Sequence, residues 1–227
     1  QNIAEQTFAQ DNSGFHTLEY LIFLNGNPRD ISSISTRQKE YIYYVTKKLL
    51  DDTVRLWAEW HGEKAISDQR DAELIENDEI TIAGGEDGFA ELLRNPNMYQ
   101  KYKIDNGLCN IANEVGTQKI GNPYREQDVY AVESWYSFNS LDDYENNIIS
   151  IENSYLGGPA ATRKSETSMS AYVASKNSDL DAEITKAISD ARKAIRDIPA
   201  PFRDQVTKGK VATIDTAMDK LAELNKS

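Results

Sequence analysis

The residues best suited to chemistry are a histidine and a glutamate near the start of the chain. His16 stands three residues before Glu19, so on a helix their side chains would lie on one face and could share a proton or a cation. Imidazole combined with carboxylates suits iron, zinc or manganese rather than metals that prefer thiolates. The same spacing also occurs in ordinary surface pairs and buried hydrogen bonds. The pair is therefore a candidate metal site with a structural alternative.

Other residues offer weaker candidates for this chemistry. Glu59 and Glu63 could add carboxylate oxygens to a site. His61 is predicted at the C-terminal end of a long helix, where the helix dipole accounts for a histidine without any ligand. Tyr41 and Tyr44 fall on the apolar stripe of that helix, which indicates core tyrosines rather than iron-binding phenolates.

Composition excludes several classes of protein. The 227 residues include 25 Lys and Arg against 37 Asp and Glu, for a net charge of −12, which argues against nucleic-acid binding. No apolar run approaches about 18 residues, so no membrane span is expected. The single cysteine, Cys109, excludes an intramolecular disulfide and a thiolate zinc site, and its apolar neighbours indicate a small buried hydrophobe.

The elements that must position these residues are helices. Apolar residues recur at steps of three and four along most of the chain, which predicts an all-helical bundle. The expected helices cover residues 14–22, 36–61, 87–93, 99–115, 141–155, 179–198 and 211–224, with a loop at 78–85. Ser140 is the expected N-cap of the fifth helix, and Leu180 is expected on the buried face of the sixth.

Three stretches of the sequence resemble the imelysin-like proteins, also known as the M75 peptidase family. That family is marked by a Gly-x-His-x-x-Glu motif, which Gly14, His16 and Glu19 match. Residues 133–157 are similar to the family's second characteristic block, and residues 198–202 resemble its C-terminal region. The landmarks occur in the family's order and extend over nearly the whole chain.

The resemblance implies a fold of two bundle-like halves around a cleft that the motif faces. We expect a motif-bearing half at residues 1–125 and a second half at residues 126–227. Family members usually carry a substantial helical segment before the motif, whereas thirteen residues precede Gly14 here. The first bundle is therefore expected to be incomplete in this chain.

The resemblance also implies export to the bacterial cell envelope, as a periplasmic protein or an outer-membrane lipoprotein, and a link to iron uptake. The chain begins at Gln1 without a charged-then-apolar leader, so a targeting segment and any lipid anchor are expected upstream. Envelope uptake proteins are the expected protein partners.

His16 and Glu19 are the predicted metal ligands, with iron or zinc as the metal. The other residues predicted to line the cleft are Gly14, Glu133, Ser134 and Ser137. A glycine just before a helix would allow close approach of a ligand to the N–H groups of the first turn. For Glu133 and the two serines, capping of a helix N-terminus predicts the same residue types, so both interpretations stay open.

These features favour an envelope protein that binds a metal ion or an iron-bearing ligand without catalytic turnover. The alternative is an M75-type metallopeptidase. Thermolysin-like zinc sites need two histidines one helical turn apart, and the inverted type needs His-x-x-Glu-His. Tyr20 follows Glu19 here, so only His61 could supply a second imidazole. A second alternative is a non-catalytic interaction module in which the His–Glu pair is structural.

Overall fold

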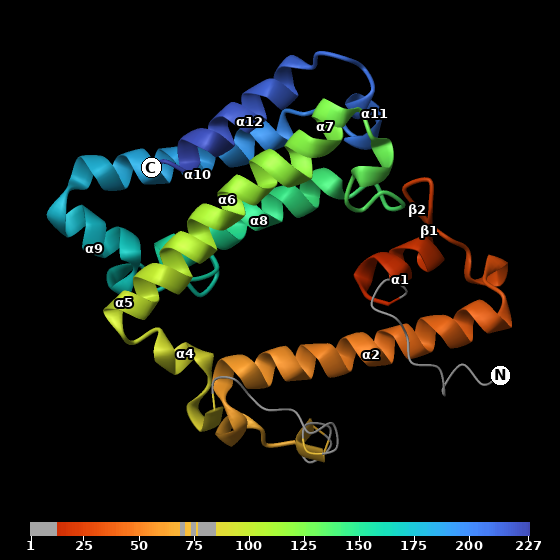
Figure 1. Ribbon diagram of the computed structural model, residues 1–227, viewed down its shortest axis with the longest axis horizontal. Coiled ribbons are helices and arrows are strands. Elements are labelled where there is room, and N and C mark those ends of the chain that lie inside the picture. The colour runs from red at the N-terminus through yellow and green to blue at the C-terminus, as the bar shows by residue number, and fades with distance from the viewer. Residues whose placement is uncertain (1–12, 69–70, 74–75, 77–84) are drawn as a thin grey trace. The chain divides into compact units, whose positions relative to one another are not determined.

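The computed structural model describes residues 13–68, 71–73, 76 and 85–227 (Figure 1). This part of the chain is almost entirely helical, which confirms the predicted all-α fold. Contacts group the chain into two compact units, a first unit of Gln1–Tyr102 and a second unit of Lys103–Ser227. The boundary expected at residue 125 stays a prediction about the family's two halves. The loop expected at 78–85 lies outside the described residues except for Gly85.

The described part of the first unit contains one long helix, three shorter helices, a two-stranded hairpin and several turns. Its elements are α1 (Phe15–Ile22), β1 (Phe23–Leu24), β2 (Asn27–Pro28), α2 (Thr36–His61), α4 (Phe89–Leu92) and α5 (Pro96–Met98), with 3₁₀ turns at Ile31–Ser33, Glu63–Ala65 and Gly85–Asp87. The helices predicted at 14–22 and 36–61 are confirmed, and the one predicted at 87–93 is shorter.

A tight hairpin follows α1. Phe23 pairs with Pro28, and Leu24 pairs with Asn27, in antiparallel register. The residues between them, Asn25 and Gly26, have φ of 51° and 78°, as a two-residue hairpin turn requires. The sequence predicts this turn but not the strands, because two-residue strands leave no alternating pattern to detect.

Both ends of α2 are set by local sequence. The Ser35 hydroxyl oxygen accepts a hydrogen bond from the Gln38 N–H at 3.3 Å, and the Gln38 side chain accepts one from the Ser35 N–H at 3.0 Å. Gly62 ends the helix with φ of 83°, and a Cβ there would lie 2.2 Å from the Glu86 carbonyl oxygen. Along its 26 residues α2 buries Val45 and Ala58 against the described part of the chain.

The second unit holds most of the helices. Its elements are α6 (Asn110–Glu114), α7 (Asn122–Glu126), α8 (Ser140–Leu156), α9 (Met169–Lys176), α10 (Ser178–Arg196), α11 (Arg203–Val206) and α12 (Ala212–Leu224), with a π-helical stretch at Val115–Gly121 and 3₁₀ turns at Val129–Ala131 and Ser165–Thr167. A further π-helical stretch, Tyr99–Cys109, runs across the boundary between the units. The helices predicted at 141–155, 179–198 and 211–224 are confirmed. The one predicted at 99–115 continues to Glu126 instead. The short helices α9 and α11 are absent from the prediction, because fewer than about three turns give little periodicity.

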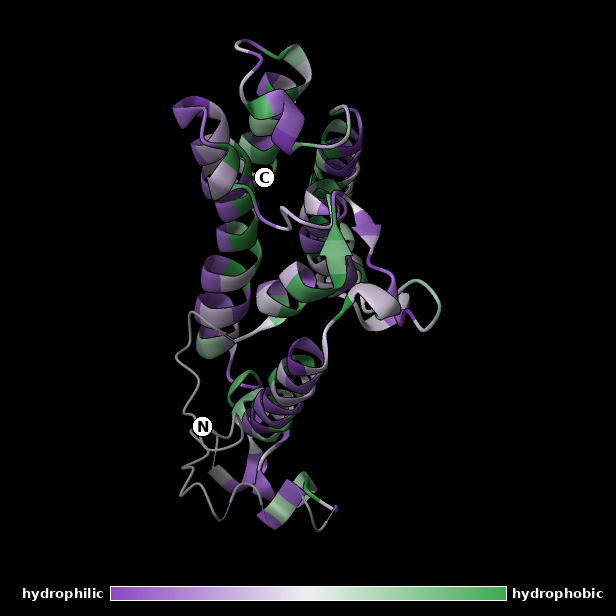
Figure 2. Cartoon of the chain, turned by 90° about the vertical axis from the view of Figure 1, so that its right-hand side faces the viewer, coloured by the Kyte–Doolittle hydropathy of each residue, from purple (hydrophilic) through white to green (hydrophobic). Residues whose placement is uncertain are grey.

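One hydrophobic core joins α6, α8, α10 and α12, which lie side by side in Figure 1. Figure 2 shows helices of the chain with hydrophobic and hydrophilic residues on opposite faces. The apolar stripe predicted on α8 is buried from Tyr144 to Tyr155. On α10 the buried residues begin at Ile188, so Leu180 in the first turn is 37% exposed, contrary to the prediction. No helix in the described ranges is long and apolar enough to span a membrane.

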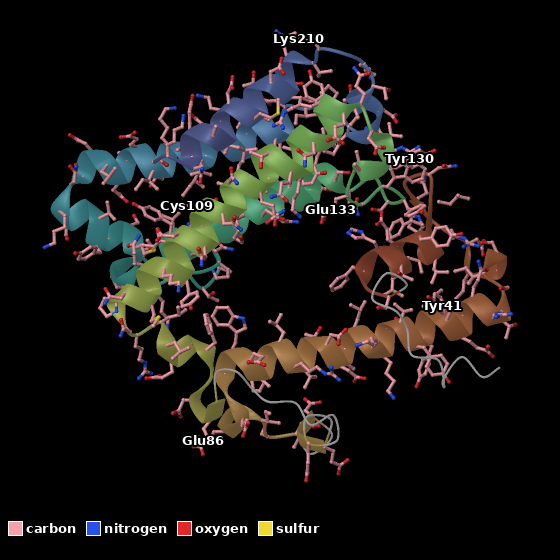
Figure 3. The ribbon with its side chains drawn as sticks, viewed as in Figure 1. Tyr41, Glu86, Cys109, Tyr130, Glu133 and Lys210 are labelled. Atoms are coloured by element: carbon pink, nitrogen blue, oxygen red, sulfur yellow. The ribbon has the colours of Figure 1, made fainter. Side chains whose placement is uncertain are left out.

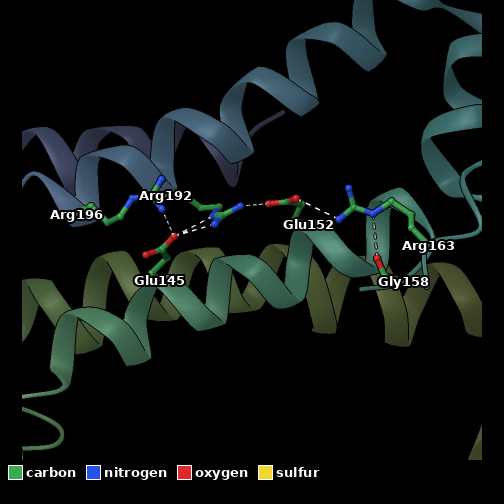
Figure 4. A network of polar contacts seen from close by, with 6 residues as sticks. All are labelled: Glu145, Glu152, Gly158, Arg163, Arg192 and Arg196. Atoms are coloured by element: carbon green, nitrogen blue, oxygen red, sulfur yellow. Dashed lines mark hydrogen bonds and ion pairs between the residues drawn. The ribbon is translucent and has the colours of Figure 1, made fainter. Parts of the chain in front are cut away.

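A network of arginine–glutamate ion pairs connects α10 to α8 (Figure 4). Arg192 donates from Nη2 to Glu145 Oε1 at 2.8 Å and from Nη1 to Glu152. Arg196 Nη1 also donates to Glu145, at 2.6 Å, and Arg163 Nη2 donates to Glu152 at 3.2 Å. The two carboxylates are mostly buried, with side chains 13% and 20% exposed, so each depends on its arginine partners.

Candidate functional site

The two residues of the candidate metal site meet on α1. His16 Nδ1 lies 3.0 Å from Glu19 Oε2, as their three-residue spacing predicts. The imidazole is 60% exposed, whereas the carboxylate is 10% exposed. A histidine that binds metal commonly gives its other ring N–H to a carboxylate, which fixes the tautomer and the direction of the ring. The observed contact has this form, with Nδ1 toward Glu19 and Nε2 as the nitrogen that would bind metal.

Gly14 lies at the N-cap position of α1 and needs to be glycine. Its φ of 105° is a conformation that side-chain-bearing residues rarely adopt. No other atom of the described chain would lie within 4 Å of a Cβ built on it. Backbone conformation therefore accounts for this glycine, and close approach of a ligand to it stays a prediction.

The polar residues of the second family block lie on the segment that leads into α8 (Figure 3). Glu133 Oε2 accepts a hydrogen bond from Lys119 Nζ at 2.7 Å, and both side chains are less than one-third exposed. The Glu133 carbonyl accepts a hydrogen bond from the Ser140 hydroxyl at 2.6 Å. Ser140 is the first residue of α8 rather than its predicted N-cap, since Asn139 takes that position.

The two serines of this segment differ in setting. The Ser134 hydroxyl donates to the Asp143 carboxylate in the first turn of α8, and its backbone has φ of 52°. Ser137 is buried, with 6% of its surface exposed. Ser134 thus ties the segment to α8 through a side-chain carboxylate, and the Asn139 side chain makes no capping hydrogen bond there.

Lys119 and Asp143 are the contacts of this segment that sequence reasoning missed. Lys119 lies in the π-helical stretch Val115–Gly121, fourteen residues before Glu133, and local periodicity does not pair the two. The Tyr144 hydroxyl donates a hydrogen bond to the backbone carbonyl of Lys119 at 3.0 Å. Burial raises the pKa of Tyr144 far above its ordinary value, and the negative charge of Glu133 adds to this.

The weaker sequence candidates have local explanations. His61 Nδ1 lies 3.0 Å from the Trp57 carbonyl oxygen, and its ring stacks on Trp57 with centroids 4.7 Å apart. Tyr41 and Tyr44 are half-buried, in line with a packing role. Cys109 is also partly buried.

Among the residues that the structure describes, no group of three or more His, Cys, Asp or Glu side chains could hold a metal ion. This finding also covers Glu59 and Glu63, so neither joins such a group there. A metal bound by His16 and Glu19 would therefore need ligands in addition to these two side chains.

Comparisons with known proteins give a consistent set of relatives. Residues 1–227 match the model of the peptidase M75 family, described as Imelysin. A protein named iron-regulated protein A from Synechococcus elongatus is 27% identical over 218 residues, which make up 93% of this chain and 55% of that protein.

Two crystal structures are also similar. One is described as an iron-regulated protein A precursor from Parabacteroides distasonis, with 32% identity and a TM-score of 0.69 over 94% of this chain and 61% of that one. The other is an imelysin peptidase from Bacteroides ovatus, with 34% identity and a TM-score of 0.57 over 78% of this chain and 49% of that one. The chain thus spans 49% to 61% of the length of these relatives.

Proposed function

We propose that this chain, which belongs to the imelysin family, binds a metal ion or an iron-bearing ligand through His16 and Glu19 without catalytic turnover. The observation that carries the proposal is the 3.0 Å contact between His16 Nδ1 and Glu19 Oε2. This contact orients the exposed imidazole of His16, and the Glu19 carboxylate that makes it is largely buried. Such a pair fits iron or zinc, both of which take imidazole and carboxylate ligands.

In this proposal His16 binds the metal through Nε2. Glu19 either holds the imidazole in the required tautomer or adds an oxygen ligand of its own. Its negative charge stabilises a bound cation in both cases, and the low exposure of the carboxylate reduces screening by water. The bound metal would supply positive charge to which an anionic or iron-bearing ligand can attach.

We further propose that Glu133, Ser134 and Ser137 contribute to ligand binding, as the resemblance to the family's second block implies. Lys119 neutralises Glu133 in the structure, so a cation bound there would compete with the Lys119 ammonium group. The site would then bind metal more weakly than a set of unpaired carboxylates would.

Iron is favoured over other metals by the names of two relatives, each called an iron-regulated protein A. A role in iron uptake at the bacterial cell envelope, as a periplasmic protein or lipoprotein with envelope uptake proteins as partners, is part of the same proposal. The metallopeptidase alternative would require a second imidazole near His16, for which His61 is the one remaining histidine of the sequence.

Equilibrium binding of zinc, and of ferrous iron without oxygen, tests the proposal. Wild type should bind about one equivalent, and His16→Ala and Glu19→Ala should each lose at least about tenfold in affinity, or roughly 1.4 kcal/mol. His61→Ala is the matched control and should bind like wild type. Equal affinity in all four proteins would refute the metal site and favour an interaction module. Zinc-dependent cleavage of an unfolded protein that disappears in His16→Ala would establish the peptidase instead.

A further inference from the structure

The segment Glu133–Asn139, here called the polar loop, has an unusual backbone. Ser134 and Phe138 both have positive φ, at 52° and 66°, although neither is glycine. For a bulky residue such as phenylalanine this conformation is strained, and it persists only where surrounding contacts enforce it. Something outside the local sequence must therefore hold the polar loop in shape.

Arg203, the first residue of α11, makes those contacts. Its guanidinium carbon lies 3.9 Å from the centroid of the Trp135 ring and 4.3 Å from the centroid of the Phe138 ring. Its Nη1 also donates to the Trp135 carbonyl oxygen at 3.1 Å. The guanidinium group is thus held by two aromatic rings and one carbonyl of the polar loop.

The backbone of Arg203 is held in place by buried neighbours in and next to α11. The neighbouring residues Phe202, Gln205 and Val206 are all buried, so α11 is fixed to the core of the second unit. The Arg203 side chain is 21% exposed, which strengthens its attraction to the ring faces relative to a fully hydrated cation. Arg203 therefore connects a rigid part of the core to a strained loop almost seventy residues earlier.

Lysine could not make the same set of contacts. A guanidinium group is planar, stacks on aromatic rings and donates several hydrogen bonds in fixed directions, whereas an ammonium group is a compact, strongly hydrated charge. Trp135 depends on this stacking in particular, because its buried Nε1 has no hydrogen-bond partner among the described residues. The Trp135 ring also contacts the Tyr130 ring, 5.9 Å away and nearly parallel, and the Tyr136 ring, 5.1 Å away and edge-on.

We infer that Arg203 is a positioning residue, which holds the polar loop so that Glu133, Ser134 and Ser137 keep the geometry needed for ligand binding. The inference rests on the proposed function, because those three side chains matter only if the loop lines the site. Arg203 itself need not touch the ligand. Its role is to hold Trp135 and Phe138, and through them the conformation of the whole polar loop.

The test measures zinc affinity, the thermal unfolding midpoint and tryptophan fluorescence for Arg203→Met and Arg203→Lys. Arg196→Met is the control, because it removes the same charge from the second unit without contacting the polar loop. Arg203→Met should bind zinc at least about tenfold more weakly at temperatures where it remains folded. Arg203→Lys should recover only part of that loss, and Arg196→Met should bind like wild type. The tryptophan fluorescence lost in Trp135→Phe is the part that comes from Trp135, and this is the part that Arg203→Met should change.

The outcomes separate this inference from the proposed function. If Arg203→Met lowers the unfolding midpoint but leaves zinc affinity intact, while His16→Ala abolishes binding, Arg203 is purely structural and the inference is wrong. If Arg203→Met and Glu133→Gln weaken binding while His16→Ala does not, the loop binds zinc and the proposed role of His16 is wrong instead. Should Arg203→Met fail to fold, full zinc affinity in folded Arg203→Lys would overturn the need for a guanidinium group.

Discussion

The two units of this protein differ in how many residues their longest described helices bury. In the second unit, the 17-residue helix α8 buries five residues and contributes to a core shared with α6, α10 and α12. In the first unit, the 26-residue helix α2 buries two residues against the described chain. The remaining buried hydrophobic residues of the first unit, within the described ranges, are Leu21 and Ile34. Length and capping favour formation of a helix, but most of its stability comes from the apolar surface that it buries against the rest of the protein.

This difference bears on the proposed function, because the candidate residues belong to different units. His16 and Glu19 belong to the sparsely packed unit, whereas the polar loop is fixed to the densely packed one by Arg203 and the contacts of Ser134. A ligand that binds the folded form stabilises what it contacts, and the gain is most visible where intrinsic stability is low. Ligand binding is therefore expected to protect α1 more than the core of the second unit.

The largest effect should come from a matched pair of leucines. Leu221→Ala should lower the free energy of unfolding by about 4 kcal/mol, because Leu221 is fully buried against Gly116. Leu21→Ala in the first unit should lose only about 2 to 3 kcal/mol, since a thinly covered site can relax around the deletion. Urea denaturation of both variants measures the difference. Equal losses would mean that the two units are packed equally well.

The charge network provides the next largest effect. Arg192→Met leaves Glu145 and Glu152 mostly buried with fewer partners, which should destabilise the second unit by about 2 to 3 kcal/mol. Arg196→Met removes an arginine whose side chain is 56% exposed and should cost less than about 1 kcal/mol. Thermal unfolding at low and high salt compares them. A similar cost for both arginines would show that burial does not set the strength of these pairs.

Alkaline pH should destabilise the second unit through Tyr144. Burial raises the pKa of this phenol well above its ordinary value near 10, so the folded protein keeps a proton that the unfolded chain releases. The contribution of Tyr144 to the free energy of unfolding should therefore be constant below about pH 9 and fall as the pH rises past about 10. Tyr144→Phe should cost about 1.5 kcal/mol at neutral pH, from the lost hydrogen bond to the Lys119 carbonyl, and should make the alkaline fall less steep. Tyr155, whose pKa burial also raises, contributes to the fall that remains. An unchanged alkaline slope in this variant would contradict the assignment to Tyr144.

The smallest effect compares two N-cap serines. Ser35→Ala removes the N-cap of α2. Ser168→Ala removes the N-cap of α9, where the Ser168 hydroxyl accepts a hydrogen bond from the Ala171 N–H at 3.0 Å. Each should cost about 1 kcal/mol of local stability. Hydrogen exchange should show the Ser35→Ala loss confined to the first turns of α2, with the core amides of the second unit unchanged. Faster exchange throughout both units would mean that they unfold together.

The sequence predicts most of the fold because long amphipathic helices carry a clear period. The ends of α2 are predictable from a capping serine and a terminal glycine, and the buried face of α8 follows from its apolar spacing. The sequence does not predict that Leu180 is exposed, because periodicity identifies a face but not how far along the helix its neighbours extend.

The candidate site is predictable only where its residues are close in sequence. The contact between His16 and Glu19 follows from three-residue spacing. The pairing of Lys119 with Glu133 and the contact of Arg203 with the polar loop depend on how distant segments fold back together. No local pattern encodes such pairs, so a single sequence names the polar residues of the loop without naming what holds them.

The central proposal is that His16, Glu19 and the polar loop all contribute to binding the same metal ion. Hydrogen exchange during a zinc titration of the whole chain tests this most directly, with His16→Ala as the control. The account predicts added protection in both α1 and residues 133–139, with one common midpoint that is lost in His16→Ala. Protection in α1 alone, in residues 133–139 alone, or in neither would contradict a single shared site.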